Sequence, residues 1–297
     1  MTTKKWFKAN TKSLEGKLIA ITGSTGGLGK VLCFYLANLG ANLVLVDRNL
    51  EKSNALKERI LKEFPSTEIS LITADMEDFS SVKEATDTLV SLKPYAIILN
   101  AGAYSIPRKT TNLGFDNLFQ INFVCPYYMA KKLMPTFEKN GGRVVAVGSI
   151  AHTYSKANPK DIDFKGVKAN SKAYGNAKRF LMFSLWELFE DKASPFLAIT
   201  HPGITFTGIT NHYPKLIFAI IKRPMKLIFM KPKIAALSIL KGVFEPTPHN
   251  KWIGPRFFGI WGLPKTTALK TCSSNEQQVI FKTAEKIYKS LENKNSL

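Results

Sequence analysis

Short apolar runs alternate with longer amphipathic stretches along the first two thirds of the chain. The apolar runs predict strands at residues 18–22, 42–46, 69–73, 95–99, 143–147 and 196–200. Between them, apolar residues recur at helical spacing and predict helices at residues 28–39, 50–64, 80–92, 113–138 and 171–190. Strands that alternate with helices are typical of a doubly wound parallel sheet. We therefore predict an α/β fold, a single Rossmann-type domain whose parallel sheet of about seven strands is flanked by helices.

The two ends of the chain carry weaker patterns. Residues 1–16 predict a loose or partly helical arm before one domain over residues 17–297. A seventh, short strand is predicted at residues 251–255, and an amphipathic C-terminal helix at residues 274–293. Residues 257–261 are apolar, and we expect them to close the far side of a pocket or to contact another subunit.

Residues 204–242 mix apolar and basic residues, and Pro214, Pro224 and Pro232 interrupt them. We favour a substrate lid for this segment, which would close an apolar wall over a site. Two alternatives stay open: simple packing against the sheet, and a basic amphipathic patch on an anionic membrane. A lid and a membrane patch are compatible if the substrate is lipid-like.

Composition and charge exclude several classes of protein. Hydrophobic residues make up 45% and charged residues 22%, an ordinary globular balance. The net charge of +20 permits a nucleic-acid or membrane partner, but the basic residues are spread along the chain, which favours a solvated lysine-rich surface and makes nucleic acid an unlikely partner. Three widely spaced cysteines and four histidines show no disulfide framework and no metal-ligand spacing, so we expect no metal. With no secretory signal and no long apolar run, we expect a cytoplasmic protein, with peripheral membrane contact left open.

A glycine-rich turn, Thr22-Gly-Ser-Thr-Gly-Gly-Leu-Gly29, joins the first predicted strand to the first helix. Glycines let the backbone approach phosphates closely, and the N–H groups of the first helical turn attract negative charge. The arrangement suits the pyrophosphate of a nucleotide. Because glycine turns are common, its meaning depends on the residues that follow.

Polar or glycine residues stand where the other predicted strands end, and ligands of doubly wound sheets bind beyond that edge. They are Asp47, Asp75, Asn100, Ser149, Pro202 and Gly203. Asp47 suits the adenine ribose of NAD, whereas Arg48 suits the 2′-phosphate of NADP. We favour NAD, because a fixed carboxylate beside the phosphate is costly, and NADP through Arg48 is the alternative.

Tyr174 and Lys178 are four residues apart and share one face of a predicted helix. A nearby ammonium lowers the pKa of a phenol, and such a tyrosine acts as a general acid or base on a carbonyl or alcohol oxygen. Two other pairs, Tyr127/Lys131 and Tyr128/Lys132, have the same spacing. Position favours Tyr174, since only its helix follows the strand that ends at Ser149.

Taken together and in order, these motifs resemble the short-chain dehydrogenase/reductase family over roughly residues 16–210. They are Thr22-Gly-x-x-x-Gly27-x-Gly29, Asp75, Asn100-Ala-Gly102, Asn122, Ser149, Tyr174-x-x-x-Lys178, and Pro202-Gly203 with Thr207. The resemblance departs from the commonest pattern at Leu99, where an asparagine often stands. The long gap from Ser149 to Tyr174, with Asp161-Ile-Asp-Phe164, resembles the retinol-dehydrogenase-like branch.

The resemblance implies roles for four catalytic residues. Tyr174 would donate or accept the proton, and Ser149 would orient and polarise the substrate oxygen. Lys178 would lower the tyrosine pKa and bond the nicotinamide ribose, and Asn122 would hold a water in a proton relay. The implied cofactor-binding residues are Thr22, Gly23, Ser24, Thr25, Gly27, Leu28, Gly29, Asp47, Arg48, Asp75, Met76, Asn100, Ala101, Gly102, Tyr174, Lys178, Pro202, Gly203 and Thr207.

These expectations describe an NAD(P)-dependent oxidoreductase. It would pass a hydride between nicotinamide and the carbonyl or alcohol carbon of an apolar small molecule, an alcohol, aldehyde or ketone. Homo-oligomers are common in the family, and we expect one here. The alternative is a nucleotide-sensing or scaffold protein without catalysis on the same fold, but such a protein would not need Asn122, Ser149, Tyr174 and Lys178 together.

Overall fold

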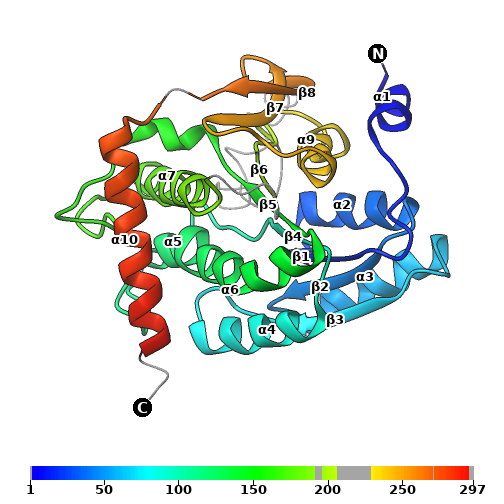
Figure 1. The fold of residues 1–297 in the computed structure, drawn as a ribbon, viewed down its shortest axis with the longest axis horizontal. Coiled ribbons are helices and arrows are strands. Elements are labelled where there is room, and N and C mark those ends of the chain that lie inside the picture. Colours follow the sequence, from blue (N-terminus) through cyan, green and yellow to red (C-terminus); the bar gives the residue numbers. More distant parts are fainter. Residues whose placement is uncertain (1, 191–195, 206–228, 270, 294–297) are drawn as a thin grey trace, which may run out of the picture.

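The chain folds around one eight-stranded sheet, with helices on both faces (Figure 1). The structure, a computed structural model, describes residues 2–190, 196–205, 229–269 and 271–293. Its strands are β1 (Leu18–Thr22), β2 (Asn42–Asp47), β3 (Ile69–Thr73), β4 (Ala96–Leu99), β5 (Arg143–Val147), β6 (Phe196–Thr200), β7 (Lys251–Phe257) and β8 (Trp261–Ala268). Its α-helices are α1 (Thr3–Asn10), α2 (Gly27–Asn38), α3 (Leu50–Glu63), α4 (Phe79–Leu92), α5 (Asn117–Phe119), α6 (Cys125–Asn140), α7 (Asn170–Leu188), α9 (Pro232–Phe244) and α10 (Ser274–Asn293).

The strand order β3-β2-β1-β4-β5-β6-β7-β8 confirms the doubly wound architecture. The chain begins at β1 near the middle of the sheet, moves outward to β3, and then crosses to β4 on the other side of β1. The order therefore reverses between β1 and β4, where such sheets open a crevice at the carboxyl ends of their strands. All neighbours from β3 to β7 are parallel, and only β8 runs antiparallel, against β7.

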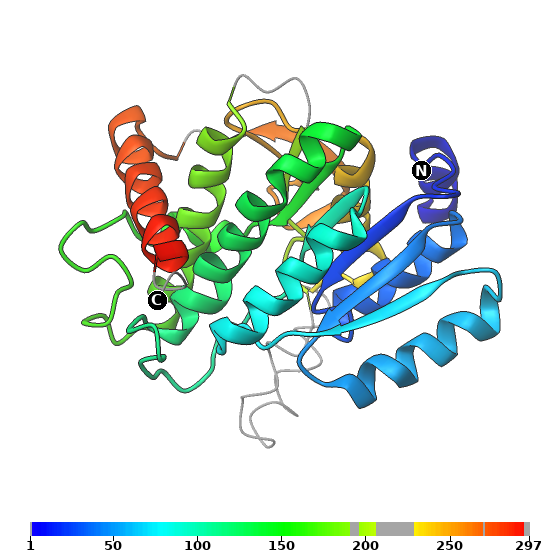
Figure 2. The ribbon, with the colours of Figure 1, turned by 60° about the horizontal axis from the view of Figure 1, so that its bottom comes forward.

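Two apolar cores lie on the two faces of the sheet. One packs α2, α3 and α9 against it through residues such as Leu32, Ile60 and Leu240. The other packs α4, α6 and α7 through residues such as Leu133 and Phe180, and α10 closes it from outside. Figures 1 and 2 show α10 along one side of the molecule beside α7, with α1 on the opposite side.

The ends of the sequence differ in part from expectation. The N-terminal arm is helical over Thr3–Asn10, because Trp6 is buried in the core beside α2. The sheet has an eighth strand, β8, which pairs with the predicted seventh strand. Residues 257–261 were expected to close a pocket or contact a subunit; they form the turn of the β7–β8 hairpin, and Phe257 and Phe258 are exposed there.

The helix expected from residue 113 begins at residue 117 and changes its hydrogen-bonding pattern at once. Residues Gln120–Val124 form a π-helical turn between α5 and α6. Short π-helical turns often mark functional sites. This one contains Asn122, one of the four expected catalytic residues. Within the described residues, no helix is long and apolar enough to cross a membrane.

Candidate active site

The glycine turn at the end of β1 is packed too tightly for side chains. Gly23 has a φ of +66°, and a Cβ atom there would lie 2.9 Å from Cα of Ala101. A Cβ atom on Gly29 would lie 2.2 Å from the carbonyl oxygen of Gly23. The start of α2 carries no acidic residue, and Gly26 offers no capping side chain to its N–H groups. Free N–H groups beside a glycine cradle fit the pyrophosphate of a dinucleotide.

Hydrogen bonds between Thr22 and Asn100 join the ends of β1 and β4. The Thr22 hydroxyl accepts hydrogen bonds from the N–H groups of Asn100 and Ala101, each at 3.0 Å. The Asn100 amide donates in return to the carbonyl oxygens of Thr22 and Gly23, also at 3.0 Å. These two expected cofactor-binding residues therefore hold the ends of β1 and β4 together, through the Thr22 hydroxyl and the Asn100 amide nitrogen.

Asp47 is buried, and both of its carboxylate oxygens are engaged by neighbouring groups. They accept hydrogen bonds from the Ser24 hydroxyl, from the N–H group of Thr25 at 3.0 Å, from the Thr25 hydroxyl at 2.9 Å and from the Ser53 hydroxyl at 3.2 Å. Through these hydrogen bonds the Asp47 carboxylate stabilises the conformation of the glycine turn. Arg48, the next residue, is exposed.

Asp75 and Met76 follow β3 at the same edge. The Asp75 carboxylate accepts a hydrogen bond from the N–H group of Glu77 at 3.0 Å. Met76 is buried, and its carbonyl oxygen accepts a hydrogen bond from the Gln120 side chain at 3.0 Å. Met76 is thereby tied to the π-helical turn, and the cofactor-binding role expected for both residues stays a prediction.

Ser149, Tyr174 and Lys178 converge where β5 ends. Ser149 is the second residue after β5, and its side chain is near enough to the Tyr174 phenol to help lower the pKa of that phenol. The Lys178 ammonium, one helical turn along α7, donates to the Val147 carbonyl oxygen at 2.8 Å and lies 5.9 Å from the centre of the Tyr174 ring. Gly102 completes the group, since a Cβ atom there would lie 3.7 Å from the Lys178 nitrogen. Residues from three motifs thus surround one point at the sheet edge.

Burial, rather than the lysine charge, dominates the acidity of these groups in this structure. Tyr174 is partly exposed as a residue. Loss of water around its hydroxyl raises the pKa of the phenol to about 12, and the nearby Ser149 side chain offsets only part of this rise. The sequence led us to expect a lowered pKa, so this expectation was wrong for the cofactor-free chain. Burial also lowers the pKa of Lys178 from 10.5 to about 8.

We expect Lys178→Met to stabilise the cofactor-free protein at pH 7. Below pH 8 the Lys178 ammonium is charged and buried in the folded chain, whereas it lies in water in the unfolded chain. The lowered pKa corresponds to a destabilisation of the fold by about 3 kcal/mol. This cost is present below the folded pKa and disappears as the pH rises toward 10.5. Urea unfolding at pH 7, 8.5 and 9.5 should show a stabilisation that shrinks with pH. Lys172→Met, an exposed lysine on the same helix, is the control, and a destabilised Lys178→Met at pH 7 would contradict this prediction.

Asn122 is fully buried and holds the backbone beside Gly102. Its amide nitrogen donates to the carbonyl oxygens of Ala103 at 2.8 Å and Leu118 at 2.9 Å. Its amide oxygen accepts from the Ala103 N–H group at 3.3 Å. The Asn122 side chain thus bonds the backbone of its own helix, one turn earlier at Leu118, as well as the segment after Gly102. The water-holding role expected for Asn122 stays a prediction.

The other two tyrosine–lysine pairs hold α10 against α6. The Tyr127 hydroxyl donates to Glu285 at 2.7 Å, and Lys131 contacts the same carboxylate. The Tyr128 hydroxyl donates to Glu292 at 3.0 Å, and Lys132 binds Glu292 at 2.7 Å. Each pair thus shares one glutamate. Neither lies at the end of β5, where the Tyr174/Lys178 pair lies; the catalytic role of Tyr174 stays a prediction.

The comparisons with known proteins agree with the resemblance that the sequence motifs showed. The sequence profile of the short chain dehydrogenases matches residues 17–159. Over these residues the chain resembles the short-chain dehydrogenase/reductase family. An uncharacterized oxidoreductase from Schizosaccharomyces pombe is 26% identical over 274 residues, which cover 87% of this chain and 81% of that protein. These likenesses support an oxidoreductase of the NAD(P)-dependent type.

Two further comparisons place the chain within the family and its fold. Human retinol dehydrogenase 13 is 25% identical over 67% of this chain and 62% of its own length, so the chain resembles the retinol-dehydrogenase-like branch. The crystal structure of an uncharacterized protein from Mycobacterium Paratuberculosis matches with a TM-score of 0.74 and 22% identity, covering 95% of this chain and 96% of the other. That likeness shows the shared fold.

Sequence reasoning missed a buried ion pair on α7, next to Lys178. Arg179, the residue after Lys178, is 2% exposed and binds both carboxylate oxygens of Glu276 on α10, at 2.7 and 2.6 Å. It also donates to the carbonyl oxygens of His152 at 3.1 Å and Thr271 at 2.5 Å. The His152 ring contacts the carbonyl oxygen of Ser149 at 2.6 Å. The C-terminal segment is thereby tied to the loop that carries Ser149.

The long loop between Ser149 and α7 folds back over the segment after Gly102. Asp163 is buried and accepts a hydrogen bond from the Asp116 N–H group at 2.8 Å. Asp116 binds Arg108 at 2.8 Å, and Arg108 also donates to the Phe164 carbonyl oxygen at 2.6 Å. Tyr104, in the same segment, packs edge-on against Tyr174 with ring centres 5.0 Å apart. The sequence offered no pattern that pairs these residues, which are far apart along the chain.

The remaining expected residues lie after β6. Pro202 and Gly203 follow β6 at the edge that holds Ser149, and Gly203 has a φ of +77°. Thr207 lies outside the described residues, as does most of the expected lid at 204–242. The described end of that segment, Pro232–Phe244, is α9, whose apolar residues pack on the sheet.

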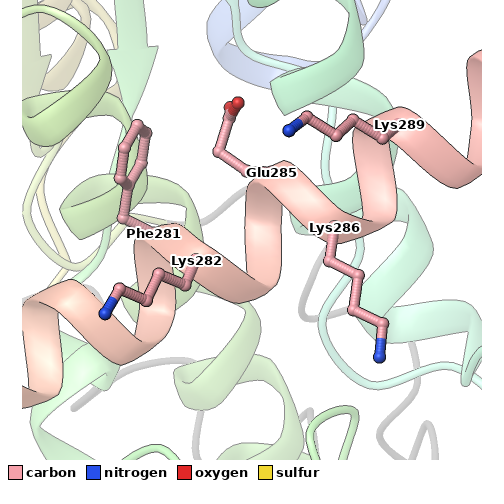
Figure 3. A pocket seen from close by; sticks show the side chains of 5 residues that line it. All are labelled: Phe281, Lys282, Glu285, Lys286 and Lys289. Atoms are coloured by element: carbon pink, nitrogen blue, oxygen red, sulfur yellow. The ribbon is translucent and has the colours of Figure 1, made fainter.

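Two other features of the described surface lie away from this site. Glu187, Glu190 and His249 bring ligand atoms within 4.8 Å of one another at the far end of α7, but two of the three are exposed. An open hollow of about 390 Å³ on α10 is lined by Phe281, Lys282, Glu285, Lys286 and Lys289 (Figure 3). All five side chains come from one helix, and the hollow contains none of the expected site residues.

Proposed function

We propose that this chain reduces or oxidises a carbonyl/alcohol pair in an apolar small molecule, with NADP as the preferred cofactor and Tyr174 as the general acid or base. The observation that carries the proposal is the convergence of Ser149, Tyr174 and Lys178 at the end of β5, beside the glycine turn of β1. A proton donor and a site for a dinucleotide lie at one edge of one sheet, as hydride transfer to a carbonyl requires.

In the reducing direction, the Tyr174 hydroxyl donates its proton to the carbonyl oxygen as negative charge develops there. The Ser149 hydroxyl, which lies near the phenol, orients the same oxygen. The Lys178 ammonium, 5.9 Å from the centre of the Tyr174 ring and with a pKa lowered by burial to about 8, stabilises the phenolate that remains. When bound, the nicotinamide supplies or accepts the hydride. The roles reverse in the oxidising direction, where Tyr174 takes the alcohol proton.

The geometry around Asp47 supports NADP over NAD. An NAD-type contact needs a carboxylate oxygen free for the ribose hydroxyls, and Asp47 is 5% exposed with both oxygens engaged. Arg48 is exposed at the same strand end, near enough to Glu77 to help lower its pKa. A guanidinium there can bind a 2′-phosphate through charge-assisted hydrogen bonds. The interpretation from sequence favoured NAD because it assumed that Asp47 faces the ribose.

The test is hydride transfer to apolar aldehydes and ketones, followed by the absorbance of the reduced cofactor. We expect wild type to oxidise NADPH in preference to NADH.

Arg48→Ser should weaken NADPH binding by about 10- to 100-fold, the value of one charge-assisted hydrogen bond, and leave NADH binding unchanged. Arg59→Ser, an exposed arginine on α3, is the matched control. Equal loss for both cofactors would contradict the role of Arg48. Absence of binding by either would favour the scaffold alternative.

A further inference from the structure

The turn of the β7–β8 hairpin places an exposed aromatic residue in a strained backbone conformation. Phe258 and Gly259 are the two central residues, with φ values of +53° and +69°, and the Ile260 N–H group donates to the Phe257 carbonyl oxygen at 2.9 Å. Two central residues of positive φ define a type I′ turn, in which the first position is normally asparagine, aspartate or glycine. A bulky residue there is an outlier.

Folding gains nothing from the side chain of Phe258. It is 85% exposed, and its neighbour Phe257 is 56% exposed. Buried apolar area stabilises the folded state, and this ring buries almost none, while its backbone adds strain. The turn therefore carries an aromatic residue that costs stability, and such an outlier points to a role outside folding.

The charge around this turn is one-sided. The 30 residues between Glu245 and Glu276 contain no acidic residue, and they include Lys251, Arg256 and Lys265. The Arg256 guanidinium lies 5.8 Å from the centre of the Phe257 ring. Basic residues are no denser here than in the rest of the chain, but no acidic residue offsets them along this segment. Exposed aromatic rings with basic neighbours and no acidic ones suit the interface of an anionic lipid bilayer.

The hairpin turn also lies at the edge of the sheet that holds the candidate active site. β7 runs parallel to β6, so the turn that follows β7 lies at the edge where β6 ends at Pro202 and Gly203. The two contact each other, because a Cβ atom on Gly203 would lie 2.6 Å from the carbonyl oxygen of Ile260. A surface that binds the turn therefore lies beside the site.

We propose that residues 256–261, the hairpin tip, bind the surface of an anionic lipid bilayer through Phe257, Phe258 and Arg256. The rings enter the headgroup region, and Arg256 contacts lipid phosphates. The binding itself does not depend on catalysis. Its consequence, that an apolar substrate can reach the site from the bilayer, rests on the proposed function.

The experiment is co-sedimentation of the full chain with phosphatidylcholine vesicles, with and without 30% phosphatidylserine, a composition chosen to resemble roughly an anionic leaflet. We expect binding to the anionic vesicles that weakens as salt is raised. Phe258→Asn should reduce this binding at least about tenfold, because the transfer of one ring is lost. The same variant should unfold at an equal or higher temperature, since asparagine suits the first position of a type I′ turn. If Phe258 served only to stabilise the fold, Phe258→Asn would instead unfold at a lower temperature than wild type.

Leu92→Asn is the matched control, since Leu92 is 40% exposed at the end of α4 that leads into β4, at the opposite edge of the sheet. It should bind vesicles as wild type does. Three results would overturn the proposal: no binding to anionic vesicles, equal binding to neutral ones, or unchanged binding by Phe258→Asn. A dimer that Phe258→Asn dissociates would also overturn it and assign the tip to contact between copies. Hydride transfer to a water-soluble aldehyde, measured separately, keeps failure of the proposed function distinct from these results.

Discussion

Tyr174→Phe should lower kcat by about 1,000-fold and leave NADPH binding nearly unchanged. The substitution removes one hydroxyl, the proton donor of the proposed reaction, and general acid–base catalysis contributes about 10²- to 10⁴-fold. The ring itself stays in place against Tyr104. Turnover is measured from NADPH absorbance, and cofactor binding from the rise in Tm that NADPH causes.

The chain offers a close control in Tyr128→Phe. Tyr128 has the same spacing to a lysine on a helix, and its hydroxyl binds Glu292 rather than Ser149. Loss of this bond should lower stability by about 1 kcal/mol without a comparable loss of turnover. If Tyr174→Phe keeps more than about a tenth of wild-type kcat, below the ordinary range for a lost proton donor, Tyr174 is not the general acid. If both variants lose turnover equally, the effect comes from altered packing.

The parallel part of the sheet could be predicted because its strands are buried on both faces. Runs such as residues 18–21 and 144–147 are apolar without interruption, and the structure forms strands at those residues. β8 could not be predicted in this way. Trp261–Ala268 contains glycine, proline and lysine, and it becomes a strand because it pairs with β7. The turn before β8 could not be predicted either, because phenylalanine occupies a position where asparagine is typical.

The candidate site shows the same division between local and distant effects. Order along the chain was enough to place Ser149, Tyr174 and Lys178 at one strand end. The direction of a side chain was not predictable: Asp47 points into the glycine turn, and four donors there occupy it. The acidity of Tyr174 also depended on burial, which no spacing between residues reveals.

Contacts between distant segments had no sequence pattern at all. Arg179 and Glu276 are 97 residues apart, and neither carries a motif. They meet because α10 packs along α7. A buried arginine inside an apolar helical stretch was the one available signal, since a fully buried arginine requires a partner. It indicated that some carboxylate must reach α7, but not which one.

Glu276→Gln should destabilise the fold by about 3–5 kcal/mol, the cost of leaving a buried charge without its partner. The Arg179 side chain is 2% exposed and that of Glu276 16% exposed, so water cannot replace the lost carboxylate charge. For a chain of this size, Tm should fall by roughly 10 °C. Glu285→Gln is the matched control, the same exchange on the same helix. Its partner Lys131 is 21% exposed, so this variant should lose no more than about 1 kcal/mol.

The difference between Glu276→Gln and wild type should also depend on pH. Burial alone raises the pKa of Glu276, but hydrogen bonds from Arg179 and Ala157 and the Arg179 charge outweigh it, and the pKa lies below its usual value. A lowered folded pKa stabilises the protein above the unfolded pKa, and that contribution disappears as the pH falls through the folded value. The two unfolding curves should therefore approach each other below about pH 4, near the usual pKa of a glutamate. If the difference in stability between the two proteins stays constant from pH 7 to pH 3, the Glu276 side chain acts through its shape. Its charge would then not be what holds α10 to α7.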